Sequence, residues 1–555
     1  MTVVAIFVWA RLPPKRQILP ATFADGTVPG VIHIHSARSD GRGSVEQIAH
    51  EAARAGLKFI IITDHGDATR TADSPVYREG VLCLDGVEIS TSGGHYIAID
   101  MPASPYPLAG NARDVVEDVK RLGGFGIAAH PDSPKPELQW KDWIAPFDGL
   151  EIINLDTAWR QKVTDTTWRP KAGLAARLLT YPFRPAESIT GLISRSSEFY
   201  RWDALSRRRH IVTVPGADAH AQIAWRASDP IAAKLSVPVP SYEAAFRTLS
   251  MRVRPDRPLT GTAATDAALI FHAIRAGHLY TVIDGAATPP SFEFTASNTL
   301  GAAGIGDQVA PSGPVALHVR SNAPDGFTTT IWRGVDPIAS DRTERDITVT
   351  ATAGEGVYWV EIHAAGQLAA VPWITSNAIY VGPLGPPAVI PARPPARTSR
   401  LLFDGRSTET WRVVTDATSL GALDMTPTTT VDNALRLRFG LSTSTANQFV
   451  ALSVATPQGV ASNDRLSFST RAEKPMRISV QLQTEKARWQ RSVYVDTDTQ
   501  AHTIFFDEFT PIGDSETYRV PLGDVRNVLF VVDTTNTRPG ASGRLWITSP
   551  ALQGN

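Results

Sequence analysis

The stretch "GVIHIHSARSDGRGSVEQIAHEAARAGLKFIIITDH", residues 30–65, sets two short apolar runs on either side of a helical pattern. Between the runs, Ser44 and Gln47 have the spacing of a capping box, and Gly56 stands where a helix would end. The apolar residues between these signals recur along one face of an amphipathic helix. The stretch therefore predicts a strand, a helix and a second strand, the unit from which a parallel sheet or barrel is built.

Two histidines stand at the end of the first run. His33 and His35 alternate along it, so we expect both side chains to point to the same side of a strand. Asp40 follows after a short polar loop. On their own these residues have two interpretations: ordinary polar residues at the rim of a barrel, or the first ligands of a metal site.

The alternation of apolar runs and helical patterns continues to about residue 288. A second helical pattern begins at Asn111 and stops at Gly123. Six further runs follow the first: "KFIIIT" (58–63), "VLCLDGVEI" (81–89), "HYIAID" (95–100), "FGIAAH" (125–130), "GLEIIN" (149–154) and "HIVTVPGADAH" (210–220). Seven runs favour a barrel over an open sheet, with its chemistry at the carboxyl ends of the strands. Residues 155–209 are a long insertion, either a cover over the barrel mouth or a pair of packing helices.

The composition is that of an ordinary globular protein. The chain has 555 residues, too many for one core, with 43% hydrophobic and 20% charged residues. Its net charge of −1 gives no basic surface for nucleic acid or an anionic membrane. The single cysteine, Cys83, excludes an internal disulfide and a thiolate metal cluster. The apolar segment 3–10 is too short to span a bilayer, and the sequence leaves both a cytoplasmic and an exported location open.

After about residue 290 the pattern changes to short alternating strands, such as "SFEFTAS" (291–297) and "VYWVEIHA" (357–364). A proline-rich stretch, "GPLGPPAVIPARPPA" (382–396), separates these strands from a last β-rich part. The expected organisation is an N-terminal segment (1–28), a barrel (29–289), an immunoglobulin-like β-sandwich (290–382), a linker (383–399) and a jelly-roll-like β-sandwich (400–555).

Acidic residues and histidines gather at the ends of these apolar runs: His33, His35, Asp40, Asp64, His65, Glu88, His95, His130, Asp218 and His220. His95 instead opens its run, but "STSGG" (90–94) could fold it back beside Glu88 as a hairpin. Each alone has an ordinary explanation as a polar residue at a rim, but packing gives no reason for six of the 13 histidines to lie there. Imidazole and carboxylate ligands suit zinc, manganese or iron. The set exceeds what one tetrahedral ion needs, so it predicts two or three ions that generate a hydroxide for hydrolysis.

Five motifs carry a resemblance: "HIHSARSDG" (33–41), "ITDHGD" (62–67), "GVEIS…GGHYI" (86–97), "AAHPD" (128–132) and "GADAH" (216–220). In this order they resemble the motifs of the PHP family, named for polymerase and histidinol phosphatase. The resemblance covers roughly residues 29–288 and implies a multidomain chain whose first part is a distorted (β/α)7 TIM-like barrel. It implies a trinuclear cluster, bridged by Glu88 and held by His33, His35, Asp40, His65, Glu88, His95, His130, Asp218 and His220.

Two further acids, Asp64 and Glu151, have no ligand role in that pattern, and we interpret them as acceptors that orient the metal-binding histidines. The segments "LLTYPFRPAESI" (178–189) and "AIRAGHLYTVIDG" (273–285) resemble a branch of large PHP proteins with appended β domains. That branch includes carbamate hydrolases of the carbaryl-hydrolase type.

The substrate is the open part of the prediction. Three divalent ions would leave the cluster with a net positive charge that favours an anionic phosphoester, and this is the preferred interpretation. Arg38, Arg42 and Arg70 lie in loops beside the expected ligands and are candidates for binding phosphate oxygens. Two ions would leave no net charge, which suits a neutral ester, amide or carbamate.

A third interpretation is a binding protein with a relic PHP fold, against which the intact ligand set argues. In the last β-rich part, Trp411 and Trp489 are candidates for stacking on sugars, although core packing is the commoner fate of such residues.

Overall fold

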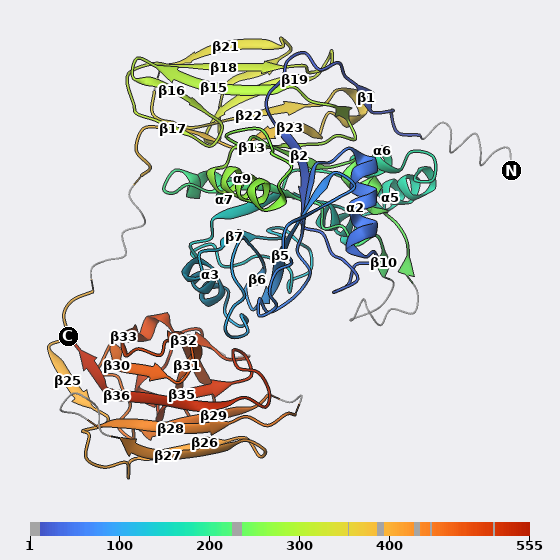
Figure 1. The fold of residues 1–555 in the computed structure, drawn as a ribbon. Coiled ribbons are helices and arrows are strands. Elements are labelled where there is room, and N and C mark those ends of the chain that lie inside the picture. The colour runs from blue at the N-terminus through green and yellow to red at the C-terminus, as the bar shows by residue number, and fades with distance from the viewer. Residues whose placement is uncertain are drawn as a thin grey trace. The chain divides into compact units, whose positions relative to one another are not determined.

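The computed structural model describes residues 12–224, 236–352, 354–385, 393–426, 433–444, 447–513 and 517–555. The apolar segment 3–10 and the central part of the expected linker lie outside the described residues. The chain divides into two compact units, drawn in blue to yellow and in orange to red in Figure 1. Unit 1 comprises residues 1–102 and 111–389, and unit 2 comprises residues 103–110 and 390–555.

Seven strands in unit 1 coincide with the seven apolar runs. In the order in which they pair, they are β2 (Val28–Ile32), β3 (Phe59–Ile62), β5 (Val81–Thr91), β6 (Gly94–Ile99), β7 (Phe125–Ala128), β8 (Gly149–Asn154) and β9 (Val212–Gly216). Strands β2, β3 and β5 are parallel, and so are β7, β8 and β9. Strand β6 runs antiparallel to both of its neighbours, because a tight hairpin joins it to β5.

The last of these strands hydrogen-bonds to the first just beyond their carboxyl ends. The amide of Ala217 donates to the carbonyl of Ile32, and the amide of His35 donates to the carbonyl of Ala219. The interior is filled by apolar residues from successive strands, including Ile32, Ile61, Leu84, Ile97, Ile127 and Val214. The polar ends of the strands therefore lie around one rim of an apolar core.

Helices fill only some of the connections. The expected capping box opens α2 (Val45–Ala55), and Gly56 ends it with a left-handed φ of 85°. Asn111 caps α3 (Ala112–Arg121) as predicted. The connection from β3 to β5 carries β4 (Val76–Arg78) instead of a helix. The regular alternation of strand and helix that the runs suggested is therefore interrupted, since the β5–β6 hairpin needs no crossover.

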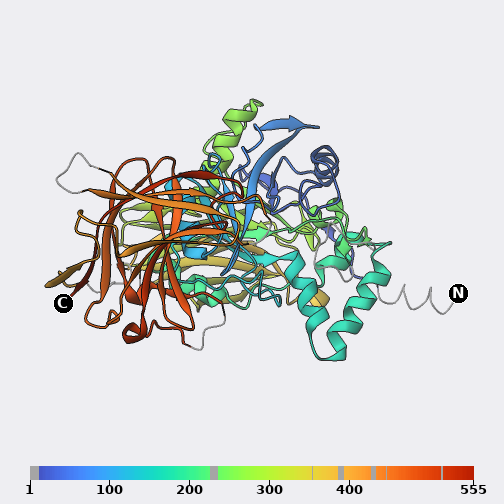
Figure 2. The ribbon, with the colours of Figure 1, turned by 90° about the horizontal axis from the view of Figure 1, so that it is seen from below.

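The insertion between β8 and β9 is helical: α4 (Leu155–Thr164), α5 (Trp168–Thr180), α6 (Pro185–Thr190) and α7 (Phe199–Ser206). In Figure 2 the teal helices of this segment project from the strands of unit 1. After β9 come the short strands β10 (Ile223–Ala224) and β11 (Ser236–Val237) and the helices α8 (Tyr242–Phe246) and α9 (Ala263–Ala276).

The sheet of unit 1 continues across position 289, where the sequence placed a domain boundary. Strand β12 (Ser250–Val253) pairs with β2 and with β13 (Leu279–Val282), and β13 pairs with β23 (Pro372–Ser376). The sheet then runs through β22 (Gly356–His363), β24 (Ile379–Val381) and β17 (Gln308–Val309), with β19 (Thr328–Arg333) and β20 (Asp336–Arg342) at its side. The backbone hydrogen bonds between β13 and β23 therefore make residues 290–382 part of the same compact unit.

A second sheet covers this part of unit 1, and Figure 1 shows it as a separate layer. Its order is β16 (Gly301–Gly304), β15 (Phe292–Asn298), β18 (Val315–Ser321) and β21 (Asp346–Ala351). A short parallel pair, β1 (Gln17–Ile18) and β14 (Ala287–Thr288), completes the strands of unit 1.

Unit 2 is a β-sandwich of two antiparallel sheets. One contains β27 (Leu420–Thr426), β28 (Ala434–Gly440), β36 (Ser542–Gly554), β30 (Arg465–Ala472) and β33 (Gln500–Phe505), with β25 (Thr398–Leu401) beside β36. The other contains β26 (Trp411–Thr415), β29 (Phe449–Ala455), β35 (Asn527–Asp533), β31 (Met476–Gln483), β32 (Arg488–Val495) and β34 (Thr510–Pro511). Trp411 and Trp489 are buried in the core between the sheets, so neither is available to stack on a sugar.

Among the described residues, no helix is both long enough and apolar enough to cross a membrane.

Candidate metal centre

The structure brings the nine predicted ligands together at one rim of the seven strands. Each lies at or beyond the end of a strand that faces this rim. His33, His35 and Asp40 follow β2, His65 follows β3, Glu88 lies in β5, His95 lies in β6, His130 follows β7, and Asp218 and His220 follow β9. The β5–β6 hairpin folds His95 back beside Glu88, as the sequence predicted.

Glu88 is the centre of the cluster. Its two carboxylate oxygens lie 2.8–3.3 Å from ring nitrogens of five different histidines: His33, His35, His65, His95 and His130. The side chain of Glu88 is completely buried. A single carboxylate thus links donors that come from four separate strand ends.

Asp218 and Asp40 extend the cluster on one side of Glu88. Asp218 Oδ1 lies 3.3 Å from His35 Nε2 and 3.5 Å from His220 Nδ1. Asp40 Oδ2 lies 3.2 Å from His220 Nε2 and 3.6 Å from His65 Nε2. Every predicted ligand therefore has at least one other within contact distance.

Four overlapping groups within the cluster could each hold a metal ion, with ligand atoms within 4.8 Å of one another. They are His35–Asp40–His65–His220, His33–His35–Asp218, His33–Glu88–His130 and His65–Glu88–His95. Several buried atoms at their centre form no hydrogen bond to the described residues: His33 Nε2, both ring nitrogens of His35, and Glu88 Oε2. Buried polar atoms normally have partners, so this donor set fits bound cations.

The electrostatics of the cluster also favour bound cations. Burial alone would lower the pKa of His220, but Asp218 and Asp40 raise it to about 10. Burial would raise the pKa of Glu88, but the imidazoles around it, His33 foremost, hold it well below its usual value. Against the lowering effect of burial, nearby carboxylates raise the pKa of three further imidazoles: His33, His65 and His130. The cluster therefore attracts positive charge.

Three of the nine residues have a strained backbone. The φ angles are 65° at His33, 49° at His130 and 44° at Asp218, in the left-handed region that residues with a side chain rarely adopt. Each such residue costs on the order of 1–3 kcal/mol and is typical of functional sites. Because β2 ends at Ile32, the alternation of a strand does not direct His33 and His35 to the same side. Their rings nevertheless lie together, with centroids 5.2 Å apart.

Glu151, in β8, holds one of these strained histidines. Its Oε1 accepts a hydrogen bond from His33 Nδ1 at 2.5 Å, and its Oε2 accepts from the backbone amide of His130 at 2.9 Å. The side-chain amide of Asn154 donates to the same Oε2. This carboxylate can approach only because the facing residue is Gly216, where an added Cβ would lie 2.0 Å from Glu151 Oε1.

Replacing Gly216 with alanine is expected to displace the Glu151 carboxylate and release the ring of His33. We expect the apparent metal affinity to fall roughly 10- to 100-fold, as when a hydrogen-bond partner of a ligand is removed. Metal titration of the purified variant measures this. Gly173→Ala on α5 is the matched control, because a Cβ there meets nothing within 4 Å. Equal metal affinity in the two variants would contradict the role given to Glu151.

The side chain of Asp64 forms no hydrogen bond to a histidine among the described residues, and its partners differ from those expected. Its Oδ1 accepts from the backbone amide of Ser36 at 2.7 Å and from the hydroxyl of Ser39 at 2.6 Å. Its Oδ2 accepts from the hydroxyl of Ser36. Asp64 therefore fixes the loop between His35 and Asp40, and acts on the cluster through the backbone.

Two of the three arginines proposed to bind substrate are engaged elsewhere. Arg38 forms ion pairs with Asp73 and Asp85, and Arg70 pairs with Asp85 at 2.6 Å and with Asp73 at 3.4 Å. Asp85 is buried, so these two arginines neutralise it. Arg42 is exposed and forms no ion pair with the described residues.

A group on α4 was missed by the sequence analysis. Asp156 is buried and accepts hydrogen bonds from the indole of Trp159 and from Arg160. Against the lowering effect of burial, Asp156 raises the pKa of Arg160, and Asp218 adds to this effect. The sequence feature that could have identified this group is the position of "LDTAWR" (155–160), directly after the run that forms β8.

The cluster opens to solvent along one edge. The side chain of His65 is 33% exposed, that of His220 19% and that of Asp40 12%, whereas His33 and His35 are completely buried. A cavity of about 140 Å³ borders His65, and a second cavity of about 170 Å³ borders Asp218 and His220. A substrate would therefore reach the cluster from this edge.

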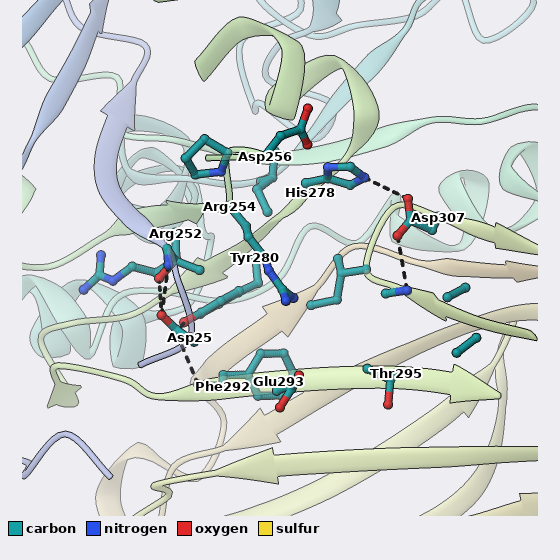
Figure 3. Close-up of a pocket in the computed structure, with 17 residues that line it drawn as sticks. Asp25, Arg252, Arg254, Asp256, His278, Tyr280, Phe292, Glu293, Thr295 and Asp307 are labelled. Atoms are coloured by element: carbon teal, nitrogen blue, oxygen red, sulfur yellow. Dashed lines mark hydrogen bonds and ion pairs between the residues drawn. The ribbon is translucent and has the colours of Figure 1, made fainter. Parts of the chain in front are cut away.

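A larger cavity, of about 360 Å³, lies between β12, β13 and the sheet that contains β15 (Figure 3). Two of its charged side chains, His278 and Asp307, are in contact at 2.9 Å, and Arg252 pairs with Asp284 outside the lining. The hydroxyl of Tyr280 donates to Asp25 at 2.7 Å. None of the four groups that could hold a metal contributes to this cavity.

These features define a multidomain protein, built mostly from β-sheets, with a buried histidine and carboxylate cluster that could hold metal ions. No protein-family model matches the chain. The uncharacterized protein MJ1587 of Methanocaldococcus jannaschii is 30% identical over 121 residues, which cover 20% of this chain and 68% of that protein. The chain therefore belongs to the same family as that protein.

Among solved structures, the chain is similar to a family 11 carbohydrate-binding module from Clostridium thermocellum in complex with a mixed-linked tetrasaccharide. The identity is 14% and the TM-score 0.24, with 28% of this chain and 95% of that chain covered. The mannan-recognising module TmCBM27 is 10% identical, with a TM-score of 0.21 and coverage of 30% and 99%. The agarase AgWH50C is 12% identical, with a TM-score of 0.22 and coverage of 28% and 26%. Scores this low assign no function to the chain.

Proposed function

We propose that this protein is a metal-dependent hydrolase of the PHP type, with its centre in a distorted (β/α)7 TIM-like barrel. The observation that carries the proposal is the cluster of nine imidazole and carboxylate side chains arranged around Glu88. A purely structural role would leave its buried ring nitrogens hydrogen-bonded, and several have no such bond within the part of the chain that the structure describes. The position at the strand ends is also where barrel enzymes carry their chemistry.

The nine residues would hold two or three divalent ions, of zinc, manganese or iron, through the four overlapping groups. Such ions supply activation of water at neutral pH and stabilisation of the negative charge that develops during hydrolysis. Glu88, which reaches five histidines, is the residue best placed to be shared between ions.

Other residues of the chain position the candidate ligands and determine where a substrate can reach the cluster. Glu151 fixes the ring of His33, and Asp64 fixes the loop that carries Asp40. The completely buried residues exclude bulk water from one side of the cluster, whereas His65 and His220 receive the substrate at the exposed edge.

A phosphoester is the first candidate for the substrate, because three ions against three carboxylates leave a net positive charge. An ester, amide or carbamate is the second candidate, and one observation favours it. Arg38 and Arg70, which would bind phosphate oxygens, already neutralise Asp73 and Asp85.

Two measurements on the full-length protein test the proposal. Elemental analysis is expected to find two or three transition-metal ions per chain. The metal-loaded protein is then assayed with phenyl phosphate and with a phenyl carbamate, with the Asp40→Asn variant, purified in the same way, as the control for contaminating enzymes. Hydrolysis of the phosphate supports the first candidate, and hydrolysis of the carbamate alone replaces it with the second. A protein that binds no metal, or that hydrolyses neither substrate, contradicts the proposal.

A further inference from the structure

The second cavity beside the cluster joins the candidate metal centre to the helical insertion. It encloses about 170 Å³ between α4, α5, α6 and the residues that follow β9. Asp218 and His220 line it from the cluster, so a molecule at the open edge can extend into it. The insertion, which the sequence left as either a cover or a packing pair, thus forms one wall of this space.

The helical wall of the cavity is mainly apolar. Six aliphatic side chains contribute to it: Leu155, Val163, Leu174, Leu178, Ile189 and Leu192. An apolar cavity of about 150 Å³ is large enough to bind benzene. The volume here therefore suits a single aromatic ring or an aliphatic group of similar size.

Most polar side chains in the wall already have partners within the chain. The hydroxyl of Tyr181 accepts from the backbone amide of Ser241 at 2.9 Å, and Ser188 hydrogen-bonds to Thr180 at 2.9 Å. The side-chain amide of Gln222 donates to the backbone carbonyl of Asp40. Asp156 is held by Trp159 and Arg160, as described above. None of these groups needs a ligand to complete its hydrogen bonds.

Arg177, on α5, is the exception. It lines the cavity, and its guanidinium forms no hydrogen bond or ion pair with the described residues. An added Cβ on Gly191 would lie 2.2 Å from Arg177 Nη2, which places the guanidinium against the segment that follows α6. Burial lowers the pKa of Arg177, because no carboxylate compensates for the lost hydration. A guanidinium in this position has five donors to offer to an anion.

We propose that this cavity binds an apolar group of the substrate, about the size of one ring, and that Arg177 binds a carboxylate carried by that group. The inference rests on the proposed hydrolase function and names the class of its substrate. For 4-carboxyphenyl phosphate, water adds across the bond between phosphorus and the aryl oxygen, and the products are 4-hydroxybenzoate and inorganic phosphate. Arg177 acts on the carboxylate and takes no part in this bond cleavage.

The activity test compares 4-carboxyphenyl phosphate with phenyl phosphate, and the corresponding pair of N-methylcarbamates, on the metal-loaded full-length protein. We expect kcat/KM to be roughly 10- to 100-fold higher for the carboxylated member, as a charge-assisted hydrogen bond provides. Arg177→Met is expected to remove this preference, so that the two members of each pair are hydrolysed with similar kcat/KM. Arg169→Met is the matched control, since Arg169 is exposed on the same helix and does not line the cavity.

A calorimetric titration with 4-hydroxybenzoate and with phenol provides a readout that does not depend on turnover. The wild-type protein should bind 4-hydroxybenzoate more tightly than phenol, and Arg177→Met should lose the difference without a change in its thermal unfolding. Equal binding of both compounds, or an unchanged preference in Arg177→Met, overturns the assignment of Arg177. Absence of any hydrolysis, together with Arg177-dependent binding of 4-hydroxybenzoate, overturns the hydrolase function and supports the carboxylate site.

Discussion

Replacing Glu88 with glutamine is expected to remove both metal binding and hydrolysis. Glutamine has nearly the same shape, but it is neutral and presents an NH2 group where Glu88 presents an oxygen to a ring nitrogen. The two or three imidazoles on the side of the new NH2 group would then face a donor, and all five within 3.3 Å would lose the charge that draws cations into the cluster. Loss of a residue that hydrogen-bonds to a metal ligand lowers metal affinity roughly 10- to 100-fold, and we expect a larger fall here because Glu88 is itself a candidate ligand. Hydrolysis should fall by at least on the order of 1,000-fold.

Elemental analysis and the rate of phenyl phosphate and phenyl carbamate hydrolysis measure these effects. Glu79→Gln is the matched control, because Glu79 is exposed and pairs only with His50 among the described residues. The control should keep full metal content and activity. A Glu88→Gln protein that retains its ions would contradict the central position given to this carboxylate.

Removing the metal from the loaded protein with a chelator is expected to destabilise unit 1 and to leave unit 2 unchanged. Ions that bind only the folded cluster stabilise it by about 4 kcal/mol when they are present at 1,000 times their Kd. Without them, ionised carboxylates and imidazoles remain buried with incomplete hydrogen bonding, which costs further free energy. All nine candidate ligands belong to unit 1, so unit 2 serves as an internal control.

Differential scanning calorimetry before and after chelation tests this expectation, since units of a multidomain chain can unfold in separate transitions. The transition of unit 1 should move to lower temperature and return when metal is added back. A shift of both transitions by the same amount, or of neither, would show that metal does not bind at the cluster.

Much of the candidate site could be read from the sequence because its residues follow apolar runs. Each run predicts a strand that ends at a definite residue, and strands of one barrel bring their ends to one rim. His65, His130 and Asp218 were identified in this way, and His95 was placed by the hairpin that "STSGG" (90–94) predicts. These patterns depend only on residues that are close together in the chain, so a single sequence is enough to detect them.

Other features depended on contacts between distant segments. The pairing of β13 with β23 joins residues that the change in strand pattern near residue 290 had assigned to different domains. Arg38 and Arg70 were expected to bind substrate, but they pair with Asp85, whose buried position no local pattern reveals. An arginine in a loop has the same local sequence signal whether it faces water, an acid or a ligand.

The sequence alone identifies which residues can carry the chemistry: six histidines and three acids, in or beside six of the seven strands. Only the tertiary structure decided how they are arranged, with Glu88 at the centre, a left-handed backbone at His33 and a space for Glu151 opposite Gly216. It also placed Arg177 in a cavity beside the cluster, with no hydrogen-bond or ion-pair partner for its guanidinium among the described residues. The physical reason is that strand ends are set by neighbours along the chain, whereas ion pairs, strain and cavities are set by which segments meet in space.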